Sequence, residues 1–177
     1  MTEIRTPRLV LRRWQEEDLV PLSEIHADPV VMRRIGDGRP RSVEQTAGDI
    51  EAWEEEWDEE GFGVFAVELL GSGELVGAVG ISVADVPTEV AGQVEISWRL
   101  GRVFWGQGYA SEAAHATLEF AVQDRGLERV IAVLRTGDSA SASVIDKLGM
   151  QAEGAAQHPV HGDDLTVFSI DLTQYQE

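Results

Sequence analysis

One stretch, residues 94–113, constrains this chain more than any other. It reads VEISWRLGRVFWGQGYASEA, so that an apolar segment is followed by a glycine-bearing turn and then by an alanine-rich segment. This order predicts a strand, a turn and the start of a helix. Gly106 and Gly108 permit positive φ and a close backbone approach to a ligand. A helix beginning near Tyr109 leaves its first N–H groups unpaired and its positive dipole end outward, so residues 106–111 are predicted to form an anion-binding cradle.

Two common phosphate-binding loops do not fit the cradle. A dinucleotide fingerprint needs Gly or Ala three positions after its second glycine, and Ser111 stands there. A P-loop needs Gly-Lys-Ser/Thr, which the chain does not contain. Taken alone, the glycine pair favours an ordinary turn, because glycine pairs mostly mark turns.

A second strand and helix follow downstream. Residues 129–135, RVIAVLR, are almost continuously apolar, as is typical of a central strand covered on both faces. In the next segment Asp138 suits the N-cap of a short amphipathic helix, and Gly149 suits its C-terminal stop. The sequence therefore predicts two successive strand–turn–helix units.

The first unit resembles the acetyl-CoA loop of the GNAT N-acetyltransferases, in particular the branch that acetylates the N-termini of ribosomal proteins. The family motif Arg/Gln-x-x-Gly-x-Gly/Ala falls on Trp105, Gly108 and Ala110. Trp105 departs from the Arg/Gln of the motif, although this branch typically has a tryptophan there. The opening of the chain, TPRLVLR at residues 6–12, resembles the same branch.

The second unit resembles the family stretch Asn-x-x-Ser-x-x-x-Leu-x-Lys-Leu-Gly-Phe. Asp138 stands for the Asn, Ile145 for the Leu and Met150 for the Phe, whereas four positions match: Ser141, Lys147, Leu148 and Gly149. Because both stretches occur at the expected separation, we expect the family's fold over almost the whole chain.

The expected fold class is α/β (α+β), with one domain over residues 1–177, a length suited to a single core. We expect a mixed, largely antiparallel sheet of six to seven strands, flanked by about four helices. The remaining strands are predicted at residues 8–14, 62–69, 75–83 and 165–172, and the remaining helices at 17–26, 30–34, 42–59 and from the cradle to about 125.

Composition excludes several classes of protein. The formal net charge of −18 argues against a nucleic-acid partner, whose binders gain affinity through basic patches. At physiological ionic strength the Debye length is roughly 8 Å, so the distant carboxylates are screened and a local cradle can still bind phosphate.

The absence of cysteine excludes disulfides and thiolate metal sites. Neither an apolar leader nor a membrane-length run is present, so we expect the cytoplasm and no membrane partner. His158 and His161 lack a carboxylate at ligand spacing, which favours a polar loop over a metal site.

The resemblance implies acetyl-CoA as the cosubstrate. Its pyrophosphate would lie in the cradle, and its pantetheine amides would pair with the end of the first strand, where a backbone N–H is also a candidate for stabilising an oxyanion. The expected cosubstrate-binding residues are Trp98, Leu100, Trp105, Gly106, Gln107, Gly108, Tyr109, Ala110, Ser111, Asp138 and Ser141.

Two residues are catalytic candidates. Glu95 lies in an apolar strand segment, where a carboxylate faces either solvent or a cleft. In the family, this strand separates from its neighbour and forms such a cleft. An acidic residue at this position often acts as the base. Burial in the cleft would raise the pKa of Glu95. Many relatives carry a proton-donating tyrosine where this chain has Ile145, so Ser141 is the candidate donor. Hydrogen bonding near the start of its helix is the alternative role of Ser141.

The predicted reaction is direct transfer of acetyl from acetyl-CoA to a primary amine, with a protein or peptide N-terminus favoured. Acetylation of a small amine, such as a polyamine or an aminoglycoside, is an alternative, and so is a non-catalytic acyl-CoA-binding module. The acidic helix face at residues 54–59 either attracts a cationic acceptor or only solvates the helix. A homodimer is one option for the assembly.

Overall fold

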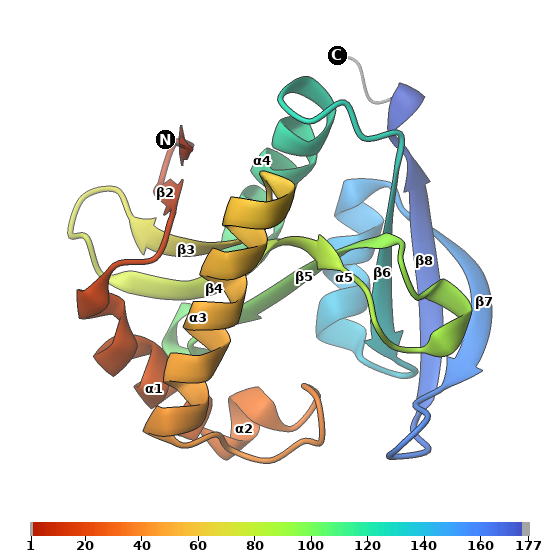
Figure 1. Cartoon of the computed structure of the whole chain (residues 1–177), viewed down its shortest axis with the longest axis horizontal. Coiled ribbons are helices and arrows are strands. Elements are labelled where there is room, and N and C mark those ends of the chain that lie inside the picture. The colour runs from red at the N-terminus through yellow and green to blue at the C-terminus, as the bar shows by residue number, and fades with distance from the viewer. Residues whose placement is uncertain (1, 175–177) are drawn as a thin grey trace.

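The computed structural model describes residues 2–174 and shows one mixed sheet with helices on both faces (Figure 1). The strand order is β1-β2-β3-β4-β5-β6-β8-β7, and neighbours are antiparallel except for β5 and β6. The strands are β1 (Glu3–Arg5), β2 (Leu9–Arg12), β3 (Val64–Leu69), β4 (Leu75–Val83), β5 (Val94–Leu100), β6 (Arg129–Arg135), β7 (Gln151–Gln157) and β8 (Asp164–Asp171).

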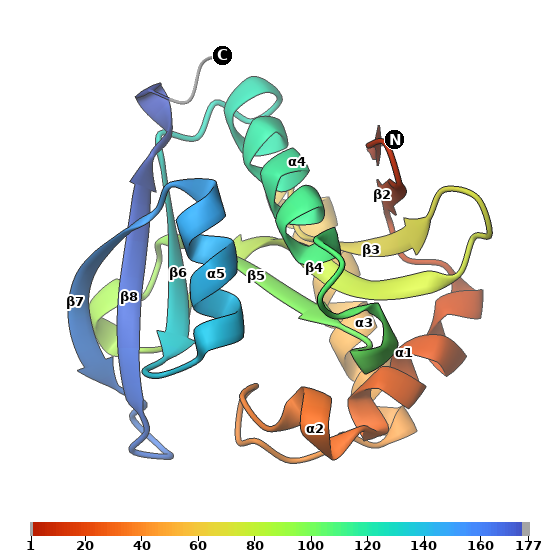
Figure 2. The same cartoon turned by 180° about the vertical axis from the view of Figure 1, so that it is seen from behind.

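Five α-helices are present in the described part of the chain, against about four expected. They are α1 (Leu19–Ala27), α2 (Pro29–Met32), α3 (Val43–Glu60), α4 (Tyr109–Gln123) and α5 (Ser139–Leu148). Helices α1 and α3 cover the face of the sheet seen in Figure 1, and α4 and α5 cover the opposite face, seen in Figure 2. The predicted fold class is confirmed.

The sheet has eight strands instead of the expected six to seven, because two edge strands carry no periodic apolar pattern. Strand β7 reads QAEGAAQ and is exposed at nearly every position. Strand β1 has three residues and pairs only with β2. Both become strands through pairing with a neighbour, which a local pattern does not reveal.

The predicted helix boundaries are largely confirmed by their caps. Ser42 and Gln45 form a reciprocal capping box at the start of α3. The Asp138 carboxylate accepts a hydrogen bond from the Ser141 N–H, and Gly149 ends α5 with φ +76°. Helix α1 begins two residues later than predicted, because a 3-10 turn at residues 16–18 precedes it.

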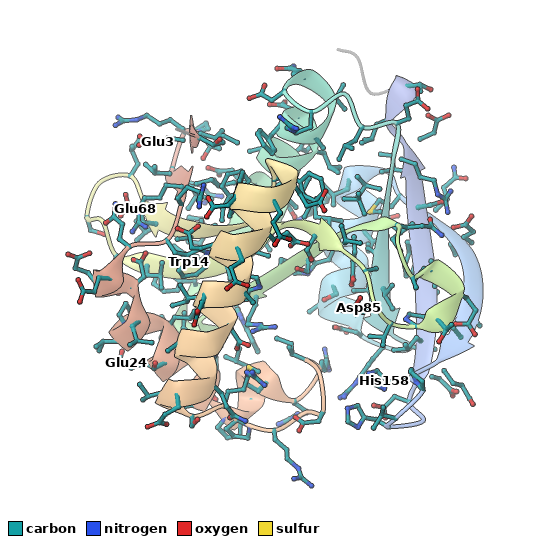
Figure 3. All side chains as sticks on the ribbon, in the orientation of Figure 1. Glu3, Trp14, Glu24, Glu68, Asp85 and His158 are labelled. Atoms are coloured by element: carbon teal, nitrogen blue, oxygen red, sulfur yellow. The ribbon has the colours of Figure 1, made fainter. Side chains whose placement is uncertain are left out.

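The apolar core lies on both faces of the sheet. On the α4 side, Ala114, Leu118 and Ala121 are fully buried, so small side chains let the helix pack closely on the strands. On the α1 side, the Trp14 ring, labelled in Figure 3, stacks on that of Trp53 with centroids 5.1 Å apart. On α3, Trp57 is buried and Trp53 is partly buried.

Strands β5 and β6 diverge, and this divergence positions the site. Their only registered pair is Glu95 with Ile131, whereas β5 pairs with β4 along its whole length. Figure 2 shows the two strands separating beyond that pair. We call the opening beside residues 96–100 the splay. No helix in the described chain has the length and apolar character needed to cross a membrane.

Candidate active site

The splay is lined by two different faces of β5. Side chains alternate along a strand, so Glu95, Ser97 and Arg99 point to one face. Trp98 points to the other face, where its indole Nε1 donates to the Ser141 Oγ of α5 over 3.2 Å. The geometry therefore separates an α5 side, with Trp98 and Ser141, from an α1–α3 side, with Glu95 and Arg99.

Glu95 lies at the apex of the splay, where β5 and β6 are last paired. Its side chain is partly buried and makes no hydrogen bond or ion pair with residues 2–174. Burial raises the pKa of Glu95 to about 7, because removal from water disfavours the charged carboxylate. A carboxylate with this pKa is suited to take up a proton near neutral pH.

Ser141 lies in the first turn of α5, opposite Trp98. Its Oγ accepts the hydrogen bond from the Trp98 indole, while its backbone N–H donates to Asp138 Oδ1 over 3.2 Å. The hydroxyl proton has no acceptor within the described residues. Ile145, at the family's tyrosine position, is 3% exposed and belongs to the core.

Asp138 is held by two partners. Besides the Ser141 N–H, its Oδ1 accepts from Arg34 Nη1 over 2.6 Å, and only 10% of its side chain is exposed. The ion pair joins the turn that follows α2 to the N-cap of α5. The carboxylate thus fixes the orientation of the turn that carries Ser141.

The cradle has the predicted backbone conformation. Gly106 and Gly108 have φ of +74° and +84°, and α4 begins at Tyr109. The N–H groups of residues 108–111 form no hydrogen bond with another backbone group within residues 2–174. Unpaired donors at the start of a helix fit the oxygens of a diphosphate, so the cradle suits the pyrophosphate of acetyl-CoA.

Arg8 supports the cradle from outside, which the sequence reading missed. Its Nε donates to Glu112 Oε1 over 2.7 Å, and its Nη1 donates to the Gln107 carbonyl over 2.8 Å. Its guanidinium lies 4.4 Å from the centroid of the Tyr109 ring. Burial of Glu112 acts to raise its pKa, but hydrogen bonds from Thr6 and Arg8 hold that pKa below its usual value. The motif at residues 6–12 marked Arg8 but did not reveal its partner 104 residues away.

Trp105 joins the cradle to the end of β5. Its indole Nε1 donates to the Leu100 carbonyl over 3.0 Å, although 46% of the residue stays exposed. Gln107 is held in turn by a 3.1 Å bond from its Nε2 to the Val103 carbonyl. Trp105 thus links two segments that contain predicted cosubstrate-binding residues, the end of β5 and the cradle.

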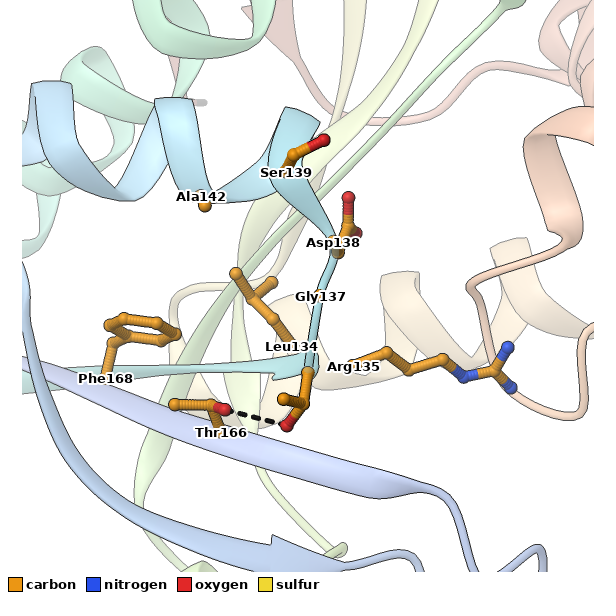
Figure 4. Close-up of a pocket in the computed structure, with 9 residues that line it drawn as sticks. Leu134, Arg135, Gly137, Asp138, Ser139, Ala142, Thr166 and Phe168 are labelled. Carbon is orange, nitrogen blue, oxygen red and sulfur yellow. Dashed lines mark hydrogen bonds between the residues drawn. The ribbon is translucent and has the colours of Figure 1, made fainter.

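A hollow next to the start of α5 lies outside this surface (Figure 4). The hydroxyls of Thr136 and Thr166 are hydrogen-bonded at 2.9 Å on its floor. Neither Glu95 nor Ser141 lines it, and of the predicted site residues it includes Asp138 alone. Its lining residues are Leu134, Arg135, Thr136, Gly137, Asp138, Ser139, Ala142, Thr166 and Phe168.

Two other sequence features have local structural roles. On the acidic face of α3, Glu54 and Asp58 pair with Arg13 at 2.5 and 3.1 Å. The rings of His158 and His161 stack at 4.3 Å in the β7–β8 loop, at the lower end of the hairpin in Figure 3. Within residues 2–174, no three His, Asp or Glu side chains are arranged to hold a metal ion.

The comparisons with known proteins identify the family. A family model described as an acetyltransferase (GNAT) domain matches residues 8–151. The chain belongs to the GNAT acetyltransferase family. It is therefore an acetyl-CoA-dependent N-acetyltransferase, as the two motifs predicted.

Individual relatives are similar in sequence and fold. The uncharacterized N-acetyltransferase p20 of Bacillus licheniformis is 27% identical over 154 residues, which cover 87% of this chain and 85% of the relative. A GNAT acetyltransferase from Bacillus anthracis has a TM-score of 0.81 and 26% identity, covering 98% of this chain and 100% of that one. RimL, a ribosomal L7/L12 α-N-protein acetyltransferase solved with coenzyme A, has a TM-score of 0.79, 16% identity and coverage of 96% and 98%. At that identity the last comparison concerns the fold alone.

Proposed function

We propose that this acetyltransferase acetylates the α-amine of a peptide or protein N-terminus. The observation that carries the proposal is Glu95: a partly buried carboxylate without a protein partner, with a pKa of about 7, at the apex of the splay. The attacking nitrogen must be neutral. With reference pKa values of about 7.7–8.0 for α-amines and 10.4 for lysine, deprotonation at pH 7 requires roughly 1 kcal/mol for the former and roughly 4.6 for the latter. A carboxylate with a pKa of about 7 matches the smaller requirement.

The two faces of β5 divide the work between the substrates. The N–H groups of residues 106–111 hold the diphosphate, and the thioester, which supplies the acetyl group, lies on the side of Trp98 and Ser141. The acceptor amine approaches from the side of Glu95. This arrangement permits attack in a ternary complex, without an acyl-enzyme, because acyl donor and amine meet at one opening.

The protons balance through two residues. The amine nitrogen forms the new bond to the acetyl carbon and loses one proton, which Glu95 takes up directly or through water. The bond from the acetyl carbon to sulfur breaks, and the thiolate gains a proton from the Ser141 hydroxyl. The free donor proton of that hydroxyl supports this role, since its oxygen already accepts from Trp98. Ser141 then regains a proton from solvent and Glu95 releases its proton to solvent, so that both residues return to their starting states.

The small-amine alternative rests on the acidic face of α3. The pairing of Glu54 and Asp58 with Arg13 weakens this alternative, because it neutralises part of the negative charge. The fold shared with RimL, whose title names an N-terminal protein acetyltransferase, agrees with the α-amine proposal at the level of the fold.

The test is a thiol-release assay at matched concentration and pH. It compares an alanine-started peptide, an N-blocked lysine peptide, spermidine and an aminoglycoside. We expect the alanine-started peptide to be acetylated fastest at pH 7. A tenfold or greater advantage of spermidine or the aminoglycoside would establish the small-amine alternative. Tight binding of acetyl-CoA without thiol release for any amine would favour a non-catalytic module.

A further inference from the structure

Arg99 is a cation of the α1–α3 side that the mechanism above does not use. It lies four residues after Glu95 on the same face of β5. Its Nη1 is 2.8 Å from His26 Nε2, and its guanidinium carbon is 6.0 Å from the centroid of the Trp53 ring. Its Nε is shielded from solvent and has no hydrogen-bond partner within the described residues. A buried donor without a partner is destabilising, so it calls for an explanation.

His26 holds Arg99 as a neutral acceptor. The Thr46 hydroxyl donates to the Ser42 carbonyl over 2.9 Å, so its oxygen accepts from His26 Nδ1, which is also 2.9 Å away. The Nε2 lone pair is then directed at Arg99. Burial lowers the pKa of His26 to about 3, with further contributions from Arg99 and Arg41. The imidazole therefore orients the guanidinium without balancing its charge.

Asp49, the carboxylate whose charge acts on Arg99, is already paired with another arginine. Asp49 binds Arg41 through two bonds of 2.6 and 2.7 Å, from Nε and Nη2. Arg99 makes no ion pair with the described residues. Burial lowers the pKa of Arg99 to about 10. The negative charge of Asp49 acts to raise this pKa, and the positive charge of Arg41 acts to lower it. The cluster of Arg41, Asp49, Arg99 and the neutral His26 thus contains one positive charge in excess.

The edge of Arg99 that remains free is suited to a carboxylate. Nη1 is occupied by His26, whereas Nε and Nη2 form no hydrogen bond with residues 2–174. These two nitrogens lie side by side and present parallel N–H groups, the geometry in which arginine binds both oxygens of a carboxylate. The adjoining Ser97 is exposed, so this side of β5 is open to solvent.

We propose that Arg99 binds a carboxylate of the acceptor whose amine lies at Glu95. The inference rests on the proposed function and adds a preference for acidic N-terminal sequences. Four strand residues separate the Cα atoms of Glu95 and Arg99 by roughly 13 Å, and an extended peptide advances about 3.3 Å per residue. The matching carboxylate is therefore that of an acidic side chain at the third or fourth residue of the acceptor.

The experiment compares kcat/KM for acidic and amide peptides. The pairs are Ala-Ala-Asp-Ala amide with Ala-Ala-Asn-Ala amide, and Ala-Ala-Ala-Asp amide with Ala-Ala-Ala-Asn amide. Charge-assisted hydrogen bonds predict that the native enzyme prefers Asp to Asn by roughly 10- to 100-fold in one pair. Arg99→Gln should reduce that ratio to about 1, and Arg99→Lys should restore part of it, because the charge returns without the fork.

A matched variant controls for net charge. Arg5→Gln removes the same charge from β1, four strands away from β5, and should keep the native Asp/Asn ratio. Equal loss of the ratio in this variant would assign it to long-range charge and overturn the site. If Arg99→Gln does not fold, the Asp/Asn ratio of kcat/KM measured with the native enzyme decides whether the acceptor carboxylate is bound.

The outcomes separate this inference from the proposed function. If all four peptides are acetylated and Asp shows no advantage, Arg99 is not an acceptor site, while the α-amine function stands. If only spermidine is acetylated, the proposed function fails. Arg99 is then judged by calorimetry with N-acetyl-Ala-Ala-Asp-Ala amide: binding that Arg99→Gln abolishes supports the site, and no binding to the native enzyme overturns it.

Discussion

In the proposed mechanism, the two faces of β5 recognise their substrates by different means. On the cosubstrate side, the donors are backbone N–H groups of the cradle, whose geometry is set by two positive-φ glycines. On the acceptor side, the donor and acceptor are side chains of β5, Arg99 and Glu95, whose properties depend on burial, and Arg99 contacts His26 of α1 and Trp53 of α3. Recognition by the backbone therefore depends on local conformation and needs no charged side chain, whereas side-chain recognition depends on packing from distant parts of the chain and on pH.

The largest effect is expected from a substitution that disrupts the acceptor side alone. Glu95→Gln should lower kcat by roughly 10² to 10⁴, the usual contribution of a general acid–base group, with the acetyl-CoA Kd nearly unchanged. Steady-state kinetics and calorimetry measure the two quantities. Glu56→Gln is the matched control, because Glu56 is also partly buried, but its Oε2 already accepts from the Val83 N–H over 3.0 Å. An unchanged kcat in Glu95→Gln would make Glu95 a structural residue.

The next effect breaks the cosubstrate side. Gly108→Val should abolish measurable acetyl-CoA binding or weaken it by at least roughly 10- to 100-fold, since φ +84° strains a β-branched residue by about 1–3 kcal/mol and its side chain obstructs the cradle. The Cβ would also lie 3.3 Å from Arg8 Nη2. Calorimetry measures the affinity.

Gly73→Val provides a control for this strain. Gly73 has φ +73° in the β3–β4 turn, away from the cradle, so its variant carries similar strain and should keep native affinity. Equal affinity of the folded Gly108→Val and Gly73→Val proteins would remove the cradle from the account.

The cosubstrate side was more predictable from the sequence than the acceptor side. The cradle, the positive φ of its glycines and the Asp138 cap are set by residues a few positions apart, and all were predictable. The bounds of β4 and β6 were also predictable, since their apolar runs are continuous. The partner of Arg99 was not, because His26 approaches it from 73 residues away and carries no distinguishing pattern.

A smaller effect is expected at Ser141, and it tests whether the two sides act independently. Ser141→Ala should lower kcat by up to about tenfold, the size of one neutral hydrogen bond, because water can replace the hydroxyl as a donor. Ser143→Ala, an exposed serine of the same helix, should leave kcat unchanged. A loss in Ser141→Ala as large as in Glu95→Gln would contradict independent roles and show that the two residues act as a unit.

The smallest effect concerns the support of the cradle. Arg8→Ala removes the bonds to Glu112 and Gln107, but 43% of the arginine side chain is exposed, so solvent screening reduces their contribution. We expect acetyl-CoA affinity to fall by about two- to fivefold, with kcat unchanged at saturation. A loss comparable to that of Gly108→Val would mean that Arg8 binds the phosphates itself.

The most direct test of the account is the pKa of Glu95 in the folded protein. Its side-chain carboxyl can be followed by ¹³C NMR and assigned by the signal that disappears in Glu95→Gln. We predict a midpoint of about 7, raised by burial from 4.5, so that the carboxylate becomes available as a base as the pH rises through neutrality. A midpoint near 4.5 would show a solvated carboxylate and contradict the role of the splay in preparing a base for an α-amine.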